Sequence, residues 1–276
     1  KRVFELWIVG KYLRGSGGKF FNLVTFLSII GMALGVGSLI VVMAVVSGFE
    51  STLRQAVVDV TGHVFVARRG EPIEDFEKFA AELKRIVPTI EAVAPFVHVE
   101  ALVAHKGKVN GVVVQGVGPT NINRVLNLKS RMVAGQFELG SGKEKRPPVI
   151  IGRGLAEKLH VNLGDELTVV LPKSAPENRG LGFTPQLKTF RVNGIVDLGI
   201  YEYDTRFLIA SSKAAQDLGG IKGYSGVRLK LTDPDLARDA SFALANELGV
   251  SFVARDWLDA NHNLFEAIKL ERVVIF

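Results

Sequence analysis

The sequence predicts an α+β fold with a transmembrane helix at its front. From Phe20 to Phe49 no side chain is ionisable, which is typical of a helix that spans a membrane. Strand and helix patterns then alternate, and they predict a water-soluble domain long enough for two lobes. The last residues are amphipathic and end in Val273–Phe276, which predicts the start of a second transmembrane helix.

These patterns divide the chain into four segments. Residues 1–19 are expected to form an amphipathic segment at the cytoplasmic surface of the membrane. Residues 20–50 form the predicted transmembrane helix, with an extension to about residue 60. Residues 61–255 are expected to fold as the soluble domain, and residues 256–276 as a helix that leads into the second, truncated span.

The first span is long enough to cross a bilayer. At about 1.5 Å per helical residue it would reach roughly 45 Å, against a hydrocarbon core of about 30 Å. Lys and Arg dominate the residues ahead of it, whereas Glu50 and Asp59 follow it, so the positive-inside rule places the N-terminus in the cytoplasm and exports the large domain. A cleaved signal peptide is the alternative, but Val46–Phe49 is a poor small-x-small cleavage site.

Gly31 and Gly35 form a small-xxx-small pair inside this span. Small residues at this spacing let two membrane helices approach until their backbones nearly touch. The pair therefore predicts a helix-packing face. The alternative is that these glycines have no such role, because glycine is frequent in membrane helices in general.

The soluble segment mixes strands with helices, which apolar periodicity locates. The predicted strands are residues 63–68, 97–104, 109–117, 149–151, 166–171, 189–196, 206–210 and 227–231. The predicted helices are residues 76–87, 154–159 and 233–249. Lys106 and Gly107 supply a hairpin turn between the second and third strands. Pro234 stands just inside the start of the last helix and Gly249 at its end, as helix termini favour.

One connection is longer than most loops in compact domains. Residues 172–186 link two predicted strands and contain three prolines, which stiffen the chain and remove backbone donors. Leu181 and Phe183 add apolar side chains, as expected of an arm that docks into a partner. A disordered segment is the alternative interpretation.

The sequence contains no recognisable pattern of catalytic or metal-binding residues. The five histidines show no paired ligand spacing and cysteine is absent, so no metal site, cofactor or disulfide is predicted. Glu202 and Asp204 stand at strand spacing, and we expect them in a solvated loop rather than in acid–base catalysis. Much of the net charge of +6 precedes Phe20, where it can meet anionic lipid head groups. We therefore predict neither an enzyme nor a nucleic-acid-binding protein.

Several segments resemble the LolC and LolE permeases of the lipoprotein-releasing ABC transporter. They are Phe4–Arg14, Phe26–Val36, Val46–Glu50 and the strand at Val64. Other motifs resemble the periplasmic domain of the wider MacB superfamily: Ile150–Leu159, Leu163–Asp165 and Gly194–Asp197. The resemblance covers nearly the whole chain. It implies a two-lobed MacB-like periplasmic domain, anchored in the bacterial inner membrane.

The resemblance also implies partners. The long loop is similar to the hook by which LolC captures the periplasmic chaperone LolA, with Pro185 at the hook proline and Lys188 at a basic residue of the adjoining pad. The implied chaperone-binding residues are Pro176, Leu181, Phe183, Pro185, Gln186 and Lys188. The further implied partners are a separate LolD-like ATPase, a second LolC/LolE-type permease or a copy of this chain, the lipoprotein substrate and membrane lipid.

Position near the outer leaflet suggests Met43, Val46 and Ser47 as residues that line the lipoprotein cleft. LolC and LolE usually carry Asn where this chain has Ser47, and the hook loop is longer here than in LolC. A LolC-type, a LolE-type and a single dual-role permease therefore stay open. Two other functions also stay open. One is a MacB-type efflux permease that meets an adaptor protein, and the other is a membrane-anchored periplasmic sensor or scaffold that transports nothing.

Overall fold

The computed structural model describes residues 4, 7, 11, 18–172, 185–263, 265, 266 and 270, with their side chains except those of 18–22, 119 and 120. The chain forms two compact units, residues 1–52 and residues 53–276. The start of the second transmembrane helix, predicted at the C-terminus, lies largely outside the described residues.

Helix α2 (Gly18–Thr61) supplies most of the described part of the first unit. From Leu23 it has the length and apolar composition needed to cross a membrane, and it is the one such helix among the described residues. Most of its large apolar side chains between Leu23 and Phe49 are exposed, and Met32 is the most exposed of them at 72 %. A lipid environment would match this apolar surface. It would also tolerate the backbone, because the hydrogen bonds of a helix lie within the helix.

The second unit contains one ten-stranded sheet. The first five strands are β1 (Val64–Arg68), β2 (Ile90–His105), β3 (Lys108–Val117), β4 (Met132–Gly135) and β5 (Pro148–Gly152). The others are β6 (Glu166–Leu171), β7 (Gln186–Val196), β8 (Phe207–Ser211), β9 (Gly226–Leu231) and β10 (Phe252–Asp256). The order is β10-β1-β9-β2-β3-β8-β5-β7-β4, and β6 pairs with both β2 and β7.

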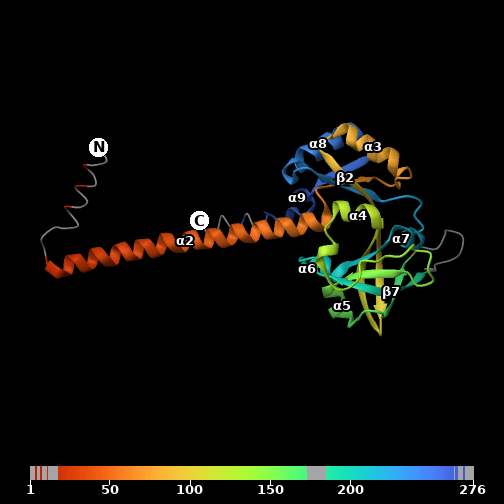
Figure 1. Ribbon diagram of the computed structural model, residues 1–276, viewed down its shortest axis with the longest axis horizontal. Coiled ribbons are helices and arrows are strands. Elements are labelled where there is room, and N and C mark those ends of the chain that lie inside the picture. Colours follow the sequence, from red (N-terminus) through yellow and green to blue (C-terminus); the bar gives the residue numbers. More distant parts are fainter. Residues whose placement is uncertain are drawn as a thin grey trace. The chain divides into compact units, whose positions relative to one another are not determined.

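Helices lie around this sheet (Figure 1), and two short 3₁₀ turns accompany them. The helices are α3 (Phe76–Ile86), α4 (Pro119–Val125), α5 (Arg153–Leu159), α6 (Tyr201–Arg206), α7 (Ser212–Gly219), α8 (Ala237–Leu248) and α9 (Trp257–Ala260). The 3₁₀ turns are η1 (Lys129–Arg131) and η2 (Pro234–Leu236).

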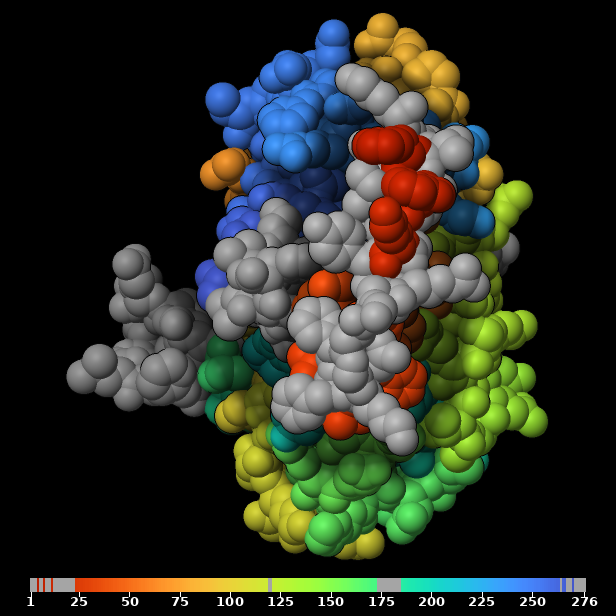
Figure 2. Space-filling view, turned by 90° about the vertical axis from the view of Figure 1, so that its left-hand side faces the viewer, coloured from red at the N-terminus to blue at the C-terminus, as the bar shows by residue number. Residues whose placement is uncertain are grey.

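Strand β2 belongs to two lobes. Its first half, up to Phe96, pairs with β9, whereas the half from Phe96 onward pairs with β3 and, near its end, with β6. Strands β2, β3, β8, β5, β7 and β6 therefore close into a ring, and this ring forms the barrel lobe together with β4, which pairs with β7, and the residues just before β4. Strands β10, β1, β9 and the start of β2, with α3 and α8, form the α8 lobe. Figure 2 shows these lobes as the blue surface at the top and the green and yellow surface at the bottom.

Each lobe has its own apolar core. The barrel core holds the inward residues of its six strands and includes Phe190, together with residues of α5 and α7. The core of the α8 lobe joins α3 and α8 to β1 and β9, and Val57 and Val58 of α2 are part of it. A third cluster, around Ile122 and Leu198, fills the space where the two lobes meet. The predicted two-lobed α+β domain is confirmed.

Most predicted strands are confirmed to within a few residues, and so is the hairpin turn. Lys106 and Gly107 both have positive φ, 45° and 82°, as a two-residue hairpin of this type requires. Strand β2 is longer than predicted, because it continues through Pro95 with a register shift between Ile90 and Ala92. The sequence analysis did not predict the short elements α4, α6, α7, β4 and β10, whereas α9 lies within the helix predicted over residues 256–276.

Candidate partner-binding site

The candidate arm connects β6 to β7. These strands are antiparallel, and Leu171 opposite Gln186 is their last pair before the connecting residues 172–185. Pro185 is exposed directly before β7. Three predicted contact residues lie outside the described part of the chain: Pro176, Leu181 and Phe183. The structure therefore describes the base of the predicted site.

Lys188 points into the end of the barrel rather than away from it. It shares a face of β7 with Phe190, which is fully buried, and its ammonium lies 5.9 Å from the centre of that ring. The Lys188 Nζ atom donates a hydrogen bond of 3.3 Å to the carbonyl of Ala214 and lies 3.8 Å from Asp217 Oδ2, both in α7. The Lys188 side chain is 19 % exposed.

Helix α7 also contacts Gln186. The side-chain amide of Gln186 donates a 3.0 Å hydrogen bond to the carbonyl of Asp217, in the last turn of α7, where a helix leaves carbonyls without internal partners. The Asp217 carboxylate also pairs with Lys213, one turn earlier, at 2.7 Å. Asp217 thus connects α7 to two of the predicted contact residues.

The outer face of the same strands carries an apolar row that the sequence analysis did not identify. Leu102 of β2 lies opposite Val170 of β6, and Val170 lies opposite Leu187 of β7. Leu187 is 61 % exposed and Leu102 is 42 % exposed. The alternation within β7 could have identified Leu187 as outward, but the pairing with β2 could not be predicted, because β2 lies far away in the sequence.

The last turns of α2 are built into the second unit. Ala56, Val57, Val58 and Val60 are buried there. Arg54 forms an ion pair with Asp235 and lies 5.1 Å from the centre of the Trp257 ring, so it contacts the α8 lobe.

Asp59 connects the same helix end to the barrel lobe. Its carboxylate accepts a 2.8 Å hydrogen bond from Arg131, which directly precedes β4. Arg131 also donates to the carbonyl of Leu198 at 3.4 Å. Both partners are largely buried, with side-chain exposures of 13 % for Asp59 and 22 % for Arg131. Five residues correspond to roughly 140° around a helix, so Arg54 and Asp59 face different directions and contact different lobes.

The predicted membrane residues lie on α2. Met43 and Val46 are partly exposed, and Ser47 is exposed. A Cβ atom added at Gly31 or Gly35 would meet no described atom within 4 Å. Within the described chain these positions therefore have space for an approaching helix.

Asp204 corrects one prediction. Glu202 and Asp204 were expected in a solvated loop, but they lie in α6, where Glu202 is exposed and Asp204 is 8 % exposed. The Asp204 carboxylate accepts a 2.7 Å hydrogen bond from the Leu198 amide, and burial raises its pKa. The Asp204 carboxylate therefore stabilises the turn before α6. The strand spacing of Glu202 and Asp204 did not indicate this role.

A second buried polar group lies between the lobes. Arg228 stacks 4.9 Å from the centre of the Phe96 ring and donates to Gln115 Oε1 at 3.0 Å, and burial lowers its pKa to about 10. The Gln115 amide nitrogen lies 3.1 Å from His98 Nδ1. No group of three or more metal-binding side chains is found among the described residues. The network links β9, β3 and β2 through Arg228, Gln115 and His98.

Comparison with known proteins agrees with this fold. The family model described as the MacB-like periplasmic core domain matches residues 25–247. The lipoprotein-releasing system transmembrane protein LolC of Neisseria meningitidis serogroup B is 34 % identical, over 99 % of this chain and 65 % of its own length.

Two further relatives are also similar to this chain over most of its length. LolC of Xylella fastidiosa strain Temecula1 is 30 % identical over 96 % of this chain and 63 % of its own length. The lipoprotein-releasing system transmembrane protein LolE of Haemophilus influenzae is 28 % identical over 92 % of this chain and 61 % of its own length. The resemblance to LolC and LolE is confirmed, and the chain spans less than two thirds of these relatives.

Proposed function

This chain belongs to the MacB-like periplasmic core domain family, and from that premise we propose that it is part of a permease subunit of a lipoprotein-releasing ABC transporter. The observation that supports this most strongly is the 34 % identity to a LolC protein over 99 % of the chain. In the proposal, α2 lies in the bacterial inner membrane with its N-terminus in the cytoplasm, and the second unit lies in the periplasm.

The physical task explains why such a permease needs a partner outside the membrane. Moving an acyl chain into water costs about 0.8 kcal/mol per CH₂, so an anchor of two or three chains represents tens of kcal/mol. The lipid anchor therefore has to pass from the bilayer to an apolar cleft, beside Met43, Val46 and Ser47 in our proposal. From there it passes to a LolA-like chaperone held at residues 172–188.

Energy and assembly are assigned to partner chains. We assign ATP hydrolysis to a LolD-like subunit, and helix packing through Gly31 and Gly35 to a second permease or a copy of this chain. Closure of the ATPase would move α2, whose last turns contact both lobes through Arg54 and Asp59. The buried position of these turns supports this coupling.

The test of the proposal is lipoprotein release by the full-length permease, assembled with its ATPase and its second permease in proteoliposomes. We expect ATP-dependent transfer of a fluorescent triacylated lipoprotein to a purified LolA-like chaperone. Deleting residues 176–185 should abolish capture of the chaperone and leave the ATPase bound. ATP-dependent export of small molecules without release of lipoprotein would contradict the proposal and favour a MacB-type efflux permease.

A further inference from the structure

The face on which Lys188 lies decides what this residue can do. Side chains of a strand alternate between two faces, and Phe190 fixes the inward face of β7. Lys188 lies on that face and Leu187 on the outward one. A partner that approaches the outside of the barrel would therefore meet Leu187 before the ammonium of Lys188.

The Lys188 ammonium already has two partners in α7. It donates to the Ala214 carbonyl and lies within ion-pair distance of Asp217. To bind an outside partner the ammonium would have to leave both, although its side chain is only 19 % exposed. The backbone carbonyl of Asp217 also accepts a hydrogen bond from the Gln186 side chain. Helix α7 therefore contacts two residues at the start of β7, Gln186 and Lys188.

From this geometry we infer that Lys188 and Asp217 form a brace that fixes the start of β7, and that they are positioning residues rather than contact residues. The inference rests on the proposed function, because the segment that they position is the chaperone-capturing arm. The brace orders the end at which residues 173–184 rejoin the sheet. Capture of a partner then costs less conformational entropy, because this end of the connection is already in place.

Two substitutions separate a brace from a contact. Lys188→Gln removes the cation, and Asp217→Asn removes the anion while the backbone carbonyl that accepts from Gln186 stays. If Lys188 is a brace, each variant weakens chaperone binding to the full-length transporter roughly tenfold, and the double variant is no weaker than either single one. If Lys188 is a contact, Asp217→Asn frees the ammonium, so affinity stays the same or rises. That result overturns the inference.

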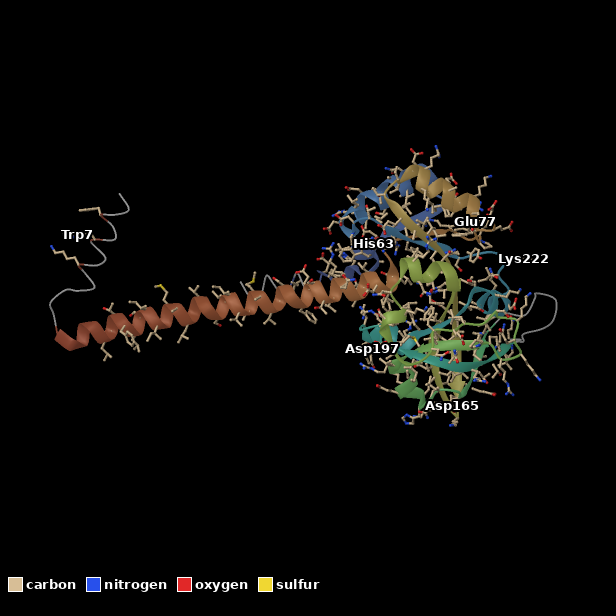
Figure 3. The ribbon with its side chains drawn as sticks, in the orientation of Figure 1. Trp7, His63, Glu77, Asp165, Asp197 and Lys222 are labelled. Atoms are coloured by element: carbon tan, nitrogen blue, oxygen red, sulfur yellow. The ribbon has the colours of Figure 1, made fainter. Side chains whose placement is uncertain are left out.

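The control is Lys222→Gln, which removes an exposed lysine just after α7 and should leave affinity unchanged (Figure 3). Hydrogen–deuterium exchange of the purified full-length permease gives a readout that needs no chaperone. The brace predicts faster exchange at residues 186–189 in Lys188→Gln and in Asp217→Asn, and unchanged exchange overturns it. Failure of the wild-type transporter to bind any chaperone would instead refute the proposed function, while the exchange data still decide the brace.

Discussion

Two imidazoles with lowered pKa values determine how the second unit should respond to pH. His63 Nδ1 accepts a 3.1 Å hydrogen bond from the Leu231 amide, and His63 lies where α2 enters the unit (Figure 3). His98 Nδ1 accepts from the Gln115 amide nitrogen, because the Gln115 oxygen is bound to Arg228, which can only donate. Loss of hydration lowers the pKa of both histidines below the ordinary 6.5; His63 is buried, whereas the His98 side chain is 42 % exposed.

The lowered pKa values predict a loss of stability in mild acid. In the pH range below 6.5 the unfolded chain binds protons that the folded His63 and His98 resist, so the unfolding free energy falls as pH drops through 6.5 toward their folded pKa values. Chemical unfolding of the purified protein in detergent, at pH 7.5 and at pH 5, measures this change. The His98→Gln variant should show a smaller difference between the two pH values than wild type.

Two carboxylates with lowered pKa values, those of Glu144 and Asp165, do not contribute to the change in unfolding free energy between pH 7.5 and pH 5. Backbone hydrogen bonds lower the pKa of Glu144 and of Asp165, whose ordinary values are 4.5 and 3.8. Their contribution to stability is lost only when pH falls below those values, outside the tested range. A pH dependence that is equal in wild type and in a His63→Gln, His98→Gln double variant would contradict the assignment.

The predictability of the candidate site also differs from residue to residue. Gln186 and Lys188 could be selected from the sequence through the resemblance of the long loop. Their contacts could not be predicted, because they depend on α7, an eight-residue helix whose buried face consists of only Ala214, Ala215 and Leu218. Asp217 therefore carried no signal in the sequence, and Asp204 was wrongly expected in a solvated loop.

At the scale of elements, the packing of α7 on β3 depends on a residue without a side chain. A Cβ atom at Gly116 would lie 2.4 Å from Ala215 Cβ and 3.0 Å from Val97 Cβ, both in the barrel core. Gly111 lies in the same strand, and a Cβ atom there would meet nothing within 4 Å. The two glycines form a matched pair for testing this packing.

Gly116→Ala should destabilise the protein by about 1–3 kcal/mol, because α7 has to move away from β3. Gly111→Ala should change the unfolding free energy by less than about 0.5 kcal/mol, or increase it slightly. Thermal unfolding followed by circular dichroism measures both. Equal effects of the two substitutions would show that α7 does not pack on Gly116 as described.

Long elements were more predictable than short ones, for a physical reason. A run such as β3, or the apolar face of α3, repeats its period often enough to identify the element from local sequence. Some short elements, such as α6 and β4, contain too few repeats, and their conformation is fixed by tertiary contacts. Strand β2 was predicted too short, because its first half, which contains Pro95, is held by β9, a strand far away in the sequence.

At the scale of the whole molecule, the two links at the end of α2 should differ in strength. The Asp59–Arg131 pair is largely buried, whereas the Arg54–Asp235 pair is exposed, with Asp235 at 70 %. Asp59→Ala leaves Arg131 buried without its carboxylate and should cost about 3 kcal/mol. Asp235→Ala should cost less than about 1 kcal/mol. Denaturant unfolding of both variants measures the difference, and equal costs would contradict the role given to burial.

The last prediction concerns transmission along α2. The helix is continuous from Gly18 to Thr61, and Ser51 and Thr52 lie just before its buried turns. Glycine weakens a helix by about 1 kcal/mol per residue, so Ser51→Gly with Thr52→Gly makes a flexible point without touching Arg54 or Asp59. If α2 transmits the motion, the full transporter carrying this double variant should keep its ATPase activity and lose most of its lipoprotein release.

The matched control is Ser51→Ala with Thr52→Ala, which removes the same hydroxyl groups and favours helix. It should release lipoprotein at the wild-type rate. Release and ATP hydrolysis are measured in the same proteoliposomes, so that a defect in assembly would lower both. Undiminished release by the glycine variant would show that the second unit is moved by some other route, and that the links through Arg54 and Asp59 only fix the end of the helix in the fold.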